Sequence, residues 1–515
     1  MTTLVSLFDR TRRLYKDSIA IVDDEAVFTW NEFVDRLSRA ANLLAKMGLE
    51  KGDRYAILST NSFRHAELIY GGYWSGCIPV PINYRLAPKE IAAILEDSGA
   101  KFLFIEESFK EVLETEELDS FKSRHLLLPT PGGPKNQEYD DLLEGCSPAK
   151  PQIAEDEDLA ILIYTGGTTG RSKGVRLTHR NIITNGMQVA LAFQLKSEDI
   201  MLHVAPMFHS ADLLGTGFLM LGTAHAYISN PTPKSILEML EKTKTTSIML
   251  PPTLVIGILQ EPDLANYDLS NLRILFYGSA PMDAEWIKKT LTAFPNTEII
   301  QLYGTTEASP ILTSLGDLEH RRAVEGEREE LLKSAGRTVL GLDLIIVDDD
   351  GNEVPRGEHG EVALRGGNLT KGYLNLPEVT KKTIRGGYFH TGDVGWMDEQ
   401  GYLFLLDRKN DMIITGAENV YSSEVEAALY KHPNVHETAV VGIPDEKYGE
   451  AVFAAIVPKP GTSITEQEII DHCRQYIGGF KIPRTMAFVE ALPKSAVGKI
   501  LKTELRKEYG GGKPV

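Results

Sequence analysis

Cysteine is scarce in this chain of 515 residues, which has only Cys77, Cys146 and Cys473. Because their number is odd and their spacing is wide, the sequence excludes a disulfide framework, and no two of them stand at the spacing of metal ligands. A protein without disulfides suits a reducing compartment. We therefore expect a cytoplasmic protein.

The chain also has fewer basic than acidic residues. Lys and Arg number 54 against 72 Asp and Glu, which gives a net charge of −18. This balance argues against binding to nucleic acid or to anionic membranes. Local positive sites for phosphates remain compatible with it, because exposed charges more than about 8–10 Å apart are largely screened.

The sequence contains no long apolar run. The most apolar segment, residues 215–229, is too short for a membrane span and contains His225. The first 17 residues reach a charge at Asp9 and lack the apolar core of a secretory signal. We therefore expect neither an integral membrane segment nor export.

What the first part of the chain does have is an alternation of amphipathic and β-branched segments. Residues 28–48 have apolar residues at helical spacing up to Gly48, and residues 54–60 read as a strand. Such alternation predicts βαβ units in an α/β fold. It continues through residues 61–107, 159–167, 235–253 and 272–280.

The pattern changes after residue 336. Residues 341–367 contain short strands and turn signals such as Asp350-Gly351, which favour antiparallel β structure. Beyond residues 407–413, short helices and strands alternate in an α+β pattern. We expect a large domain of βαβ-type subdomains and a small β-rich subdomain over residues 1–407, a connection at 408–411, and a C-terminal domain over 412–515.

The strongest functional signal is the segment 164–174, Tyr-Thr-Gly-Gly-Thr-Thr-Gly-Arg-Ser-Lys-Gly. Its glycines let the backbone approach a ligand closely, and its hydroxyls and lysine are donors for phosphate oxygens. It is not a Walker A loop, because Lys173 follows Ser172 and precedes Gly174. The candidate phosphate-binding residues are Thr165, Gly166, Gly167, Thr168, Thr169, Gly170 and Lys173.

This segment resembles the phosphate-binding signature of the acyl-adenylate-forming enzymes, which include acyl- and aryl-CoA ligases, firefly-type luciferases and stand-alone adenylation domains of peptide synthetases. It departs from the common pattern at Gly166, where the family often has Ser, and at Ser172, where it often has Pro. Further family motifs follow in the expected order over nearly the whole chain. The resemblance implies a mobile C-terminal domain.

Residues 303–307, Tyr-Gly-Thr-Thr-Glu, resemble the family's adenylate motif. An aromatic face such as Tyr303 can stack on a base, and the Glu307 carboxylate suits Mg²⁺ shared with phosphate oxygens. The resemblance also implies a catalytic role for Thr306. Residues 278–281 resemble the loop at the adenine edge. The candidate adenine-binding residues are Gly278, Ser279, Ala280 and Tyr303.

Residues 388–395 resemble a motif whose aspartate, here Asp393, binds the ribose hydroxyls, and a carboxylate can accept from both hydroxyls at once. Arg408 matches the family's second ribose contact. Asn410 falls at the family's hinge, where Asp or Lys is usual. Because Asn tolerates left-handed backbone conformations, a hinge role is compatible with it.

Residues 493–499 resemble the last motif, and Lys499 matches the family's catalytic lysine. A positioned ammonium stabilises the charge that builds when a carboxylate attacks the α-phosphorus. His209, a further candidate catalytic residue, lies where relatives begin the carboxylate pocket. Amino-acid-activating relatives carry Asp there, which argues against an amino-acid substrate, although Asp212 lies nearby. An apolar slot for the acid has the candidates Met207, Leu213, Leu214, Phe218, Leu254 and Ile311.

The resemblance implies that CoA is the second substrate. Gly416 matches the segment that flanks the pantetheine tunnel, and Lys481 and Arg484 are candidates for contacts with CoA phosphates. It further implies ATP, Mg²⁺ and a small carboxylic acid, and no nucleic acid. Because relatives are often dimers, a homodimer is also expected.

The function that this pattern predicts is an AMP-forming acid–thiol ligase, an acyl-CoA synthetase. The acid is a medium- or long-chain fatty acid or an arylalkenoic acid. The alternatives are an adenylation enzyme that loads a separate carrier protein and a catalytically dead nucleotide-binding protein. Luciferase-type oxidation uses the same motifs.

Overall fold

The computed structural model describes residues 3–23, 25–133, 137–165, 172–409, 411–415, 418–445, 448–494 and 500–510. By its internal contacts the chain divides into two compact units. The first comprises Met1–Leu344, Leu364–Phe389 and Gly401–Leu403, and the second comprises Ile345–Ala363, His390–Gln400 and Phe404–Val515. These units reflect packing and do not locate a hinge, so the connection expected at 408–411 stays a prediction.

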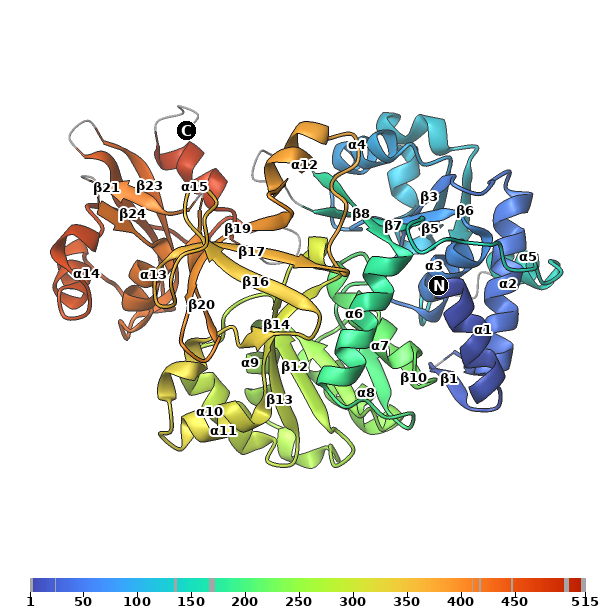
Figure 1. Cartoon of the computed structure of the whole chain (residues 1–515), viewed down its shortest axis with the longest axis horizontal. Helices are drawn as coiled ribbons and strands as arrows, with labels where there is room; N and C mark the ends of the chain where they lie inside the picture. The colour runs from blue at the N-terminus through green and yellow to red at the C-terminus, as the bar shows by residue number, and fades with distance from the viewer. Residues whose placement is uncertain are drawn as a thin grey trace. The chain divides into compact units, whose positions relative to one another are not determined.

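The first unit opens with α1 (Leu4–Tyr15) and a four-stranded parallel sheet. Its two faces bury different clusters of apolar side chains, one with α2 and α3 and the other with α4. Figure 1 shows α4 on the other side of this sheet from α2 and α3. This arrangement confirms the βαβ units predicted between residues 28 and 107. The elements are β4 (Ile78–Pro81), β3 (Arg54–Leu58), β5 (Phe102–Glu106), β6 (His125–Leu128), α2 (Trp30–Lys46), α3 (Phe63–Ser75) and α4 (Pro88–Ser98).

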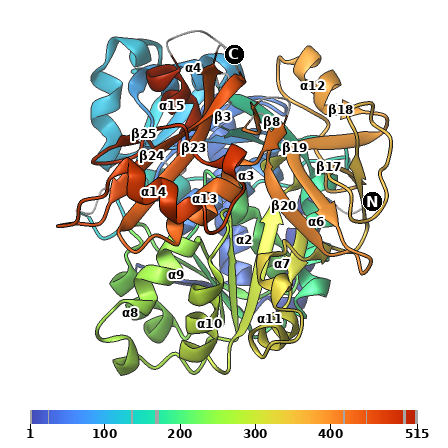
Figure 2. The ribbon, with the colours of Figure 1, turned by 90° about the vertical axis from the view of Figure 1, so that its left-hand side faces the viewer.

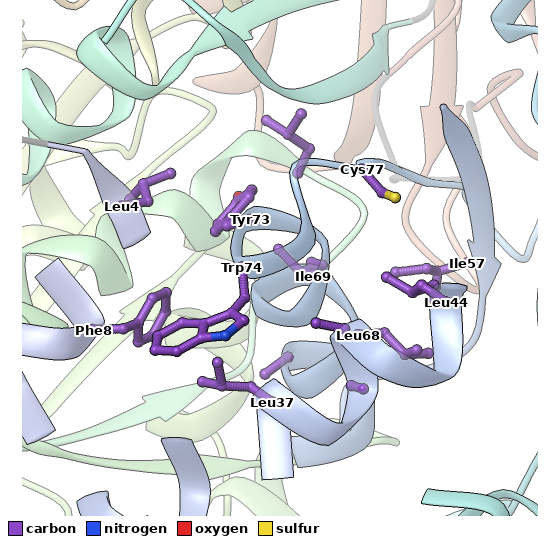
Figure 3. Packing of buried hydrophobic residues seen from close by; sticks show 14 of the residues in the cluster. Leu4, Phe8, Leu37, Leu44, Ile57, Leu68, Ile69, Tyr73, Trp74 and Cys77 are labelled. Carbon is purple, nitrogen blue, oxygen red and sulfur yellow. The ribbon is translucent and has the colours of Figure 1, made fainter. Parts of the chain in front are cut away.

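Helices α2 and α3 pack closely because Gly71 lacks a side chain. A Cβ built at Gly71 would stand 2.8 Å from the Cβ of Ala40. Helix α2 begins at a capping box formed by Thr29 and Glu32 and ends before Gly48, whose φ is +82°. Leu37 and Leu44 of α2 and Leu68 of α3 lie in this core (Figure 3). The end predicted at Gly48 is therefore confirmed.

A nine-stranded sheet forms the rest of the first unit's core, in the order β15-β14-β13-β12-β11-β9-β10-β1-β2. Strands β9 to β13 are parallel, and β14 runs antiparallel to β13. Its strands are β1 (Ile19–Val22), β2 (Val27–Thr29), β9 (Ile200–His203), β10 (Ala224–Tyr227), β11 (Ser247–Leu250), β12 (Ile274–Gly278), β13 (Glu298–Gly304), β14 (Ile311–Leu315) and β15 (Arg337–Thr338).

Helices cover both faces of this sheet. Figure 2 shows α8, α9 and α10 on one side of β11 to β13 and α6 and α7 on the other. The helices are α6 (His179–Ala192), α7 (Gly215–Leu219), α8 (Pro233–Thr243), α9 (Pro252–Leu259), α10 (Ala284–Ala293) and α11 (Asp317–Val324). The apolar segment 215–229 is thus split between α7 and β10. Among the described residues no helix has the length and apolarity that crossing a membrane requires.

The second unit ends in an α+β layer, as the sequence predicts for the C-terminal residues. Strands β22, β21, β24 and β23 pair in that order, and β25 adds parallel to β24. The strands are β21 (Ile413–Thr415), β22 (Glu418–Val420), β23 (Val435–Asp445), β24 (Gly449–Pro458) and β25 (Thr485–Phe488), and the helices are α13 (Ser422–Tyr430), α14 (Glu466–Cys473) and α15 (Lys502–Tyr509).

The β-rich stretch predicted after residue 336 is present. Its strands are β16 (Leu342–Val347), β17 (Gly360–Gly366), β18 (Ile384–Arg385), β19 (Tyr388–Met397) and β20 (Leu403–Arg408). Gly351, the second residue of the turn signal Asp350-Gly351, has a φ of +88°, and Gly357, after Arg356, has a φ of +85°. Left-handed backbone of this kind is accessible to glycine at little cost, which explains the turns.

Candidate active site

The predicted phosphate-binding segment is framed by an antiparallel pair of strands. Strand β7 (Leu159–Thr165) pairs with β8 (Lys173–Thr178), and Thr165 stands opposite Lys173. The Tyr164 hydroxyl donates to Asp97 Oδ2 at 2.7 Å, and a Cβ at Gly174 would lie 2.9 Å from the Tyr164 ring. These contacts fix both ends of the segment. Gly166, Gly167, Thr168, Thr169 and Gly170 lie outside the described residues.

Tyr373 joins the phosphate-binding segment to the adenylate motif. Its hydroxyl donates to Glu307 Oε1 at 2.8 Å, and Lys173 Nζ stands 5.5 Å from the centre of its ring. The backbone N–H of Leu374 donates to Gly174 O at 2.8 Å, and that of Thr370 donates to Glu307 O at 2.7 Å. The structure therefore brings Lys173 and Glu307 into contact with one tyrosine, Tyr373, a residue that the sequence analysis missed.

Glu307 fits the metal that the motif implies. Its Oε1 accepts from Tyr373, while Oε2 has no hydrogen-bond donor among the residues that the structure describes. Mg²⁺ is usually held by one or two carboxylates together with substrate phosphates, so a single glutamate beside a phosphate-binding segment suffices. When bound, Mg²⁺ would neutralise charge on the triphosphate.

Thr306 contacts the segment that follows β9. Its hydroxyl and that of Ser210 are 2.9 Å apart, and both side chains are buried. Next to Ser210, the ring of His209 accepts at Nδ1 from the backbone N–H of Ala211 at 3.2 Å. A backbone N–H can only donate, so neutral His209 holds its proton on Nε2 and can donate from there to a carboxylate or phosphate oxygen.

The candidate adenine residues lie at one edge of the nine-stranded sheet. Strands β12 and β13 are parallel neighbours, so Gly278, the last residue of β12, and Tyr303, the next-to-last residue of β13, lie at the same edge. A Cβ at Gly278 would stand 2.4 Å from Leu302 O, and Ser279 turns the chain with a φ of +69°. Only glycine permits this approach of the strands. Ser279 and Ala280 are exposed, and a planar ligand can lie along them.

The candidate ribose residues pair with each other in the second unit. Arg408 Nε stands 2.6 Å from Asp393 Oδ1, and the Asp393 backbone N–H donates to Thr391 Oγ1 at 3.0 Å. Asp393 is buried, whereas the Arg408 side chain is 55% exposed. The pair thus presents a carboxylate next to a guanidinium that solvent reaches.

The candidate CoA residues have partners within the second unit. Lys481 Nζ stands 2.7 Å from both carboxylate oxygens of Glu424, and the Arg484 guanidinium lies 3.9 Å from the centre of the Tyr448 ring. Three other predicted residues lie outside the described part of the chain, namely Asn410, Gly416 and Lys499.

Five of the six apolar residues proposed for the acid separate into two groups, and the sixth, Leu254, is half-buried in α9 and belongs to neither. Met207 and Leu213 line a small pocket together with His209 and Asp212. Leu214, Phe218 and Ile311 instead lie in the buried cluster between α6, α7 and the sheet. Apolar residues at such spacing do not by themselves distinguish a slot from a core, which is why sequence reasoning grouped them.

Comparison with known proteins assigns the family. A family model described as AMP-binding enzyme matches residues 8–374, and one described as AMP-binding enzyme C-terminal domain matches residues 424–499. A feruloyl-CoA synthase of Amycolatopsis sp is 34% identical, with 97% of this chain and 98% of that protein covered. A long-chain-fatty-acid–CoA ligase of Escherichia coli O6:H1 is 32% identical, with 99% and 95% covered.

Comparison with solved structures supports the same family assignment. ATP-bound MatB from Rhodopseudomonas palustris has a TM-score of 0.88 at 28% identity and covers 99% of this chain and 100% of its own. The o-succinylbenzoate–CoA synthetase MenE from Bacillus subtilis, in complex with ATP and magnesium ion, has a TM-score of 0.84 at 26% identity, with 97% and 98% covered. The predicted α/β fold is confirmed, and the chain belongs to the AMP-binding enzyme family.

Proposed function

We propose that this protein activates a carboxylic acid with ATP and then transfers the acyl group to CoA. It is an AMP-forming acyl-CoA synthetase that uses ATP, Mg²⁺ and CoA and acts on fatty or arylalkenoic acids. The observation that supports the nucleotide site is the convergence of Lys173, Tyr373 and Glu307.

In the first half-reaction the acid's carboxylate attacks the α-phosphorus of ATP, and pyrophosphate leaves. Lys173 and the glycine–threonine segment hold phosphate oxygens, and Tyr373 orients Glu307 for the metal. His209 donates from Nε2 toward the reacting carboxylate or phosphate. Lys499 stabilises the charge on the transferring oxygens.

In the second half-reaction the CoA thiol attacks the acyl carbonyl and AMP leaves. We propose that the C-terminal domain turns about the connection at 408–411, so that Lys499 departs and the segment around Gly416 approaches. One cleft cannot hold the lysine on the triphosphate and the thiol tunnel at the same time. Lys481 and Arg484 then contact CoA phosphates, Asp393 and Arg408 hold the ribose, and Gly278 to Ala280 with Tyr303 hold the adenine.

Two assays test this function. We expect that labelled pyrophosphate exchanges into ATP only when a carboxylic acid is added. If no acid supports this exchange, adenylation is contradicted and the catalytically dead nucleotide-binding alternative is favoured. Release of AMP that depends on CoA is also expected. Adenylation without CoA-dependent release would instead favour a separate carrier protein as the acceptor.

We further propose a cytoplasmic location and a homodimer. Cys77, Cys146 and Cys473 are all unpaired and buried, which suits a reducing compartment. Light scattering during gel filtration tests the dimer, because a mass near the monomer's 57.0 kDa would contradict it.

A further inference from the structure

Asn61 is held rigidly in the short connection between β3 and α3 of the first unit. The next residue, Ser62, caps α3 by accepting from the His65 backbone N–H at 3.1 Å. On the other side, Thr60 donates from its backbone N–H and from its hydroxyl to the buried Glu106 carboxylate, at 2.8 and 2.6 Å. The backbone on both sides of Asn61 is therefore fixed, and its side chain is buried.

The Asn61 amide binds three peptide groups of a segment that lies 142 to 146 residues further along the chain. Its Nδ2 donates to His203 O and to Ala205 O, each at 3.0 Å, and its Oδ1 accepts from the Met207 backbone N–H at 2.9 Å. The segment leaves β9 at His203 and passes through Pro206, which has no N–H for strand pairing. The side-chain amide therefore takes the place of a neighbouring strand.

These bonds are not easily replaced by others. Both His203 and Met207 are buried, and backbone groups that lose their partner away from water cost free energy. Without the amide, His203 O would retain a longer bond, from the Ile228 N–H at 3.4 Å. The segment would therefore shift to find new partners for its remaining peptide groups.

The segment that Asn61 holds also carries His209. The His209 backbone N–H donates to Pro206 O at 2.8 Å. Pro206 stands between Ala205 and Met207, and both of these bond the Asn61 amide. A shift of the Pro206 carbonyl would therefore move His209 with it.

The two ends of the loop around His209 are tied to each other independently of Asn61. At the start of the loop His203 Nδ1 stands 2.5 Å from Oδ1 of Asp212, which lies three residues beyond His209. Replacing Asn61 leaves this tie in place. We therefore expect such a variant to keep its fold and to lose the support of the middle of the loop.

We propose that Asn61 is a positioning residue for the first half-reaction, because its amide sets where His209 stands. The inference rests on the proposed function, in which His209 donates from Nε2 toward the reacting carboxylate or phosphate. It adds a residue that lies outside the motifs recognised in the sequence. Misplacing a catalytic group by about 1 Å can cost roughly a hundredfold in rate, so a side chain that acts only through a loop can have a large effect.

A double-mutant cycle tests this inference by acid-dependent exchange of labelled pyrophosphate into ATP. The substrate is the acid that the unmodified protein activates best in a panel of fatty and arylalkenoic acids. Asn61→Ala should lower kcat/KM for this acid roughly 10- to 100-fold, because His209 is displaced. His209→Ala already lacks the group that Asn61 positions, so adding Asn61→Ala to it should cost less than about threefold more. A merely structural role would cost the same factor in both backgrounds.

Asn181→Ala is the matched control for this cycle. Asn181 is also buried, and its Nδ2 donates to Gly367 O and Leu369 O at 2.9 and 2.7 Å. Its Oδ1 accepts from the Thr178 backbone N–H at 2.9 Å. It thus makes the same kinds of bond but holds a different segment. Asn181→Ala should therefore lower kcat/KM by the same factor in the unmodified protein and in His209→Ala.

An unchanged kcat/KM in Asn61→Ala, or an equal factor of loss with and without His209, would overturn the inference and leave the proposed function intact. No acid-dependent exchange in the unmodified protein with any acid would instead contradict the proposed function. Should Asn61→Ala fail to fold, Asn61→Asp enters the same cycle. It keeps the size and the acceptor for the Met207 N–H, but an ionised carboxylate cannot donate to the two carbonyls.

Discussion

At the scale of single residues, Tyr373 is the informative position. It lies 66 residues from Glu307 in the chain and 200 from Lys173, yet it contacts both. Loops that are far apart in sequence are thereby fixed relative to one another. The segment 371–375, Lys-Gly-Tyr-Leu-Asn, gives no local sign of this role, because an aromatic residue next to a glycine is common in loops.

We predict that Tyr373→Phe lowers kcat/KM for ATP by roughly tenfold. The change removes the 2.8 Å hydrogen bond to Glu307, and hydrogen bonds to charged groups contribute about 1.5–3 kcal/mol. Acid-dependent pyrophosphate exchange at varied ATP measures it. Tyr402→Phe removes a comparable but longer contact with Glu319, at 3.4 Å, and should leave exchange unchanged. Equal behaviour of the two variants would contradict a role for Tyr373 at the nucleotide.

At the scale of elements, the close packing of α2 on α3 depends on the absence of a side chain at Gly71. We predict that Gly71→Ala destabilises the protein by about 1–3 kcal/mol, the usual cost of overpacking, because the new Cβ would stand 2.8 Å from Ala40 Cβ. Urea unfolding measures the change.

Gly479→Ala serves as the control for this prediction. Nothing lies within 4 Å of a Cβ built at Gly479, and its φ is not in the left-handed region, so the free energy of unfolding should change by less than about 0.5 kcal/mol. If Gly71→Ala were as stable as this variant, the helices would have room to separate, and the packing described above would be wrong.

At the scale of the whole molecule, buried histidines, among them His65 and His179, make stability depend on pH. Burial lowers the pKa of His65 and of His179 to about 4, from about 6.5 in an unfolded chain. Between pH 4 and pH 6.5 these two histidines are therefore protonated in the unfolded state but not in the folded state. Stability from these groups is complete above pH 6.5 and is lost as pH falls toward 4, by about 1.4 kcal/mol per pH unit for each histidine.

We predict that His179→Gln makes the free energy of unfolding fall less steeply between pH 7 and pH 5. The difference corresponds to one proton, and urea unfolding at several pH values measures it. His436→Gln changes an exposed histidine and should keep the slope of the unmodified protein. If the free energy of unfolding changed equally with pH in the unmodified protein, His179→Gln and His436→Gln, His179 would not be buried in its neutral form.

The proposed turn of the C-terminal domain, which assigns Lys499 to the first half-reaction alone, also concerns the whole molecule. We predict that Lys499→Ala lowers the adenylation rate by roughly 10²–10³, because a charge-stabilising donor is lost. It should spare thioester formation from supplied acyl-AMP, because the lysine has left by then. Lys507→Ala, an exposed lysine of α15, is the control and should leave both rates intact. Equal loss in both half-reactions would contradict the proposed turn of the domain.

The class of fold and the motifs could be predicted from local stretches of sequence. Helical spacing, strand composition and glycine stops are local properties, so α2 and the strands up to residue 107 follow from neighbouring residues alone. The motifs at 164–174 and 303–307 are likewise continuous in sequence. Their family could be recognised without knowing which of their atoms meet.

Which side chains share a site became evident only from the folded chain. Thr306 meets Ser210 across 96 positions, and Asp212 meets His203 and, through it, His225 across a parallel sheet. The folded chain also separates Met207 and Leu213, which line the pocket, from Phe218, which lies in the core. The physical reason is that such contacts depend on how distant strands and loops are brought together, and hydrophobic periodicity records only which face of an element is buried.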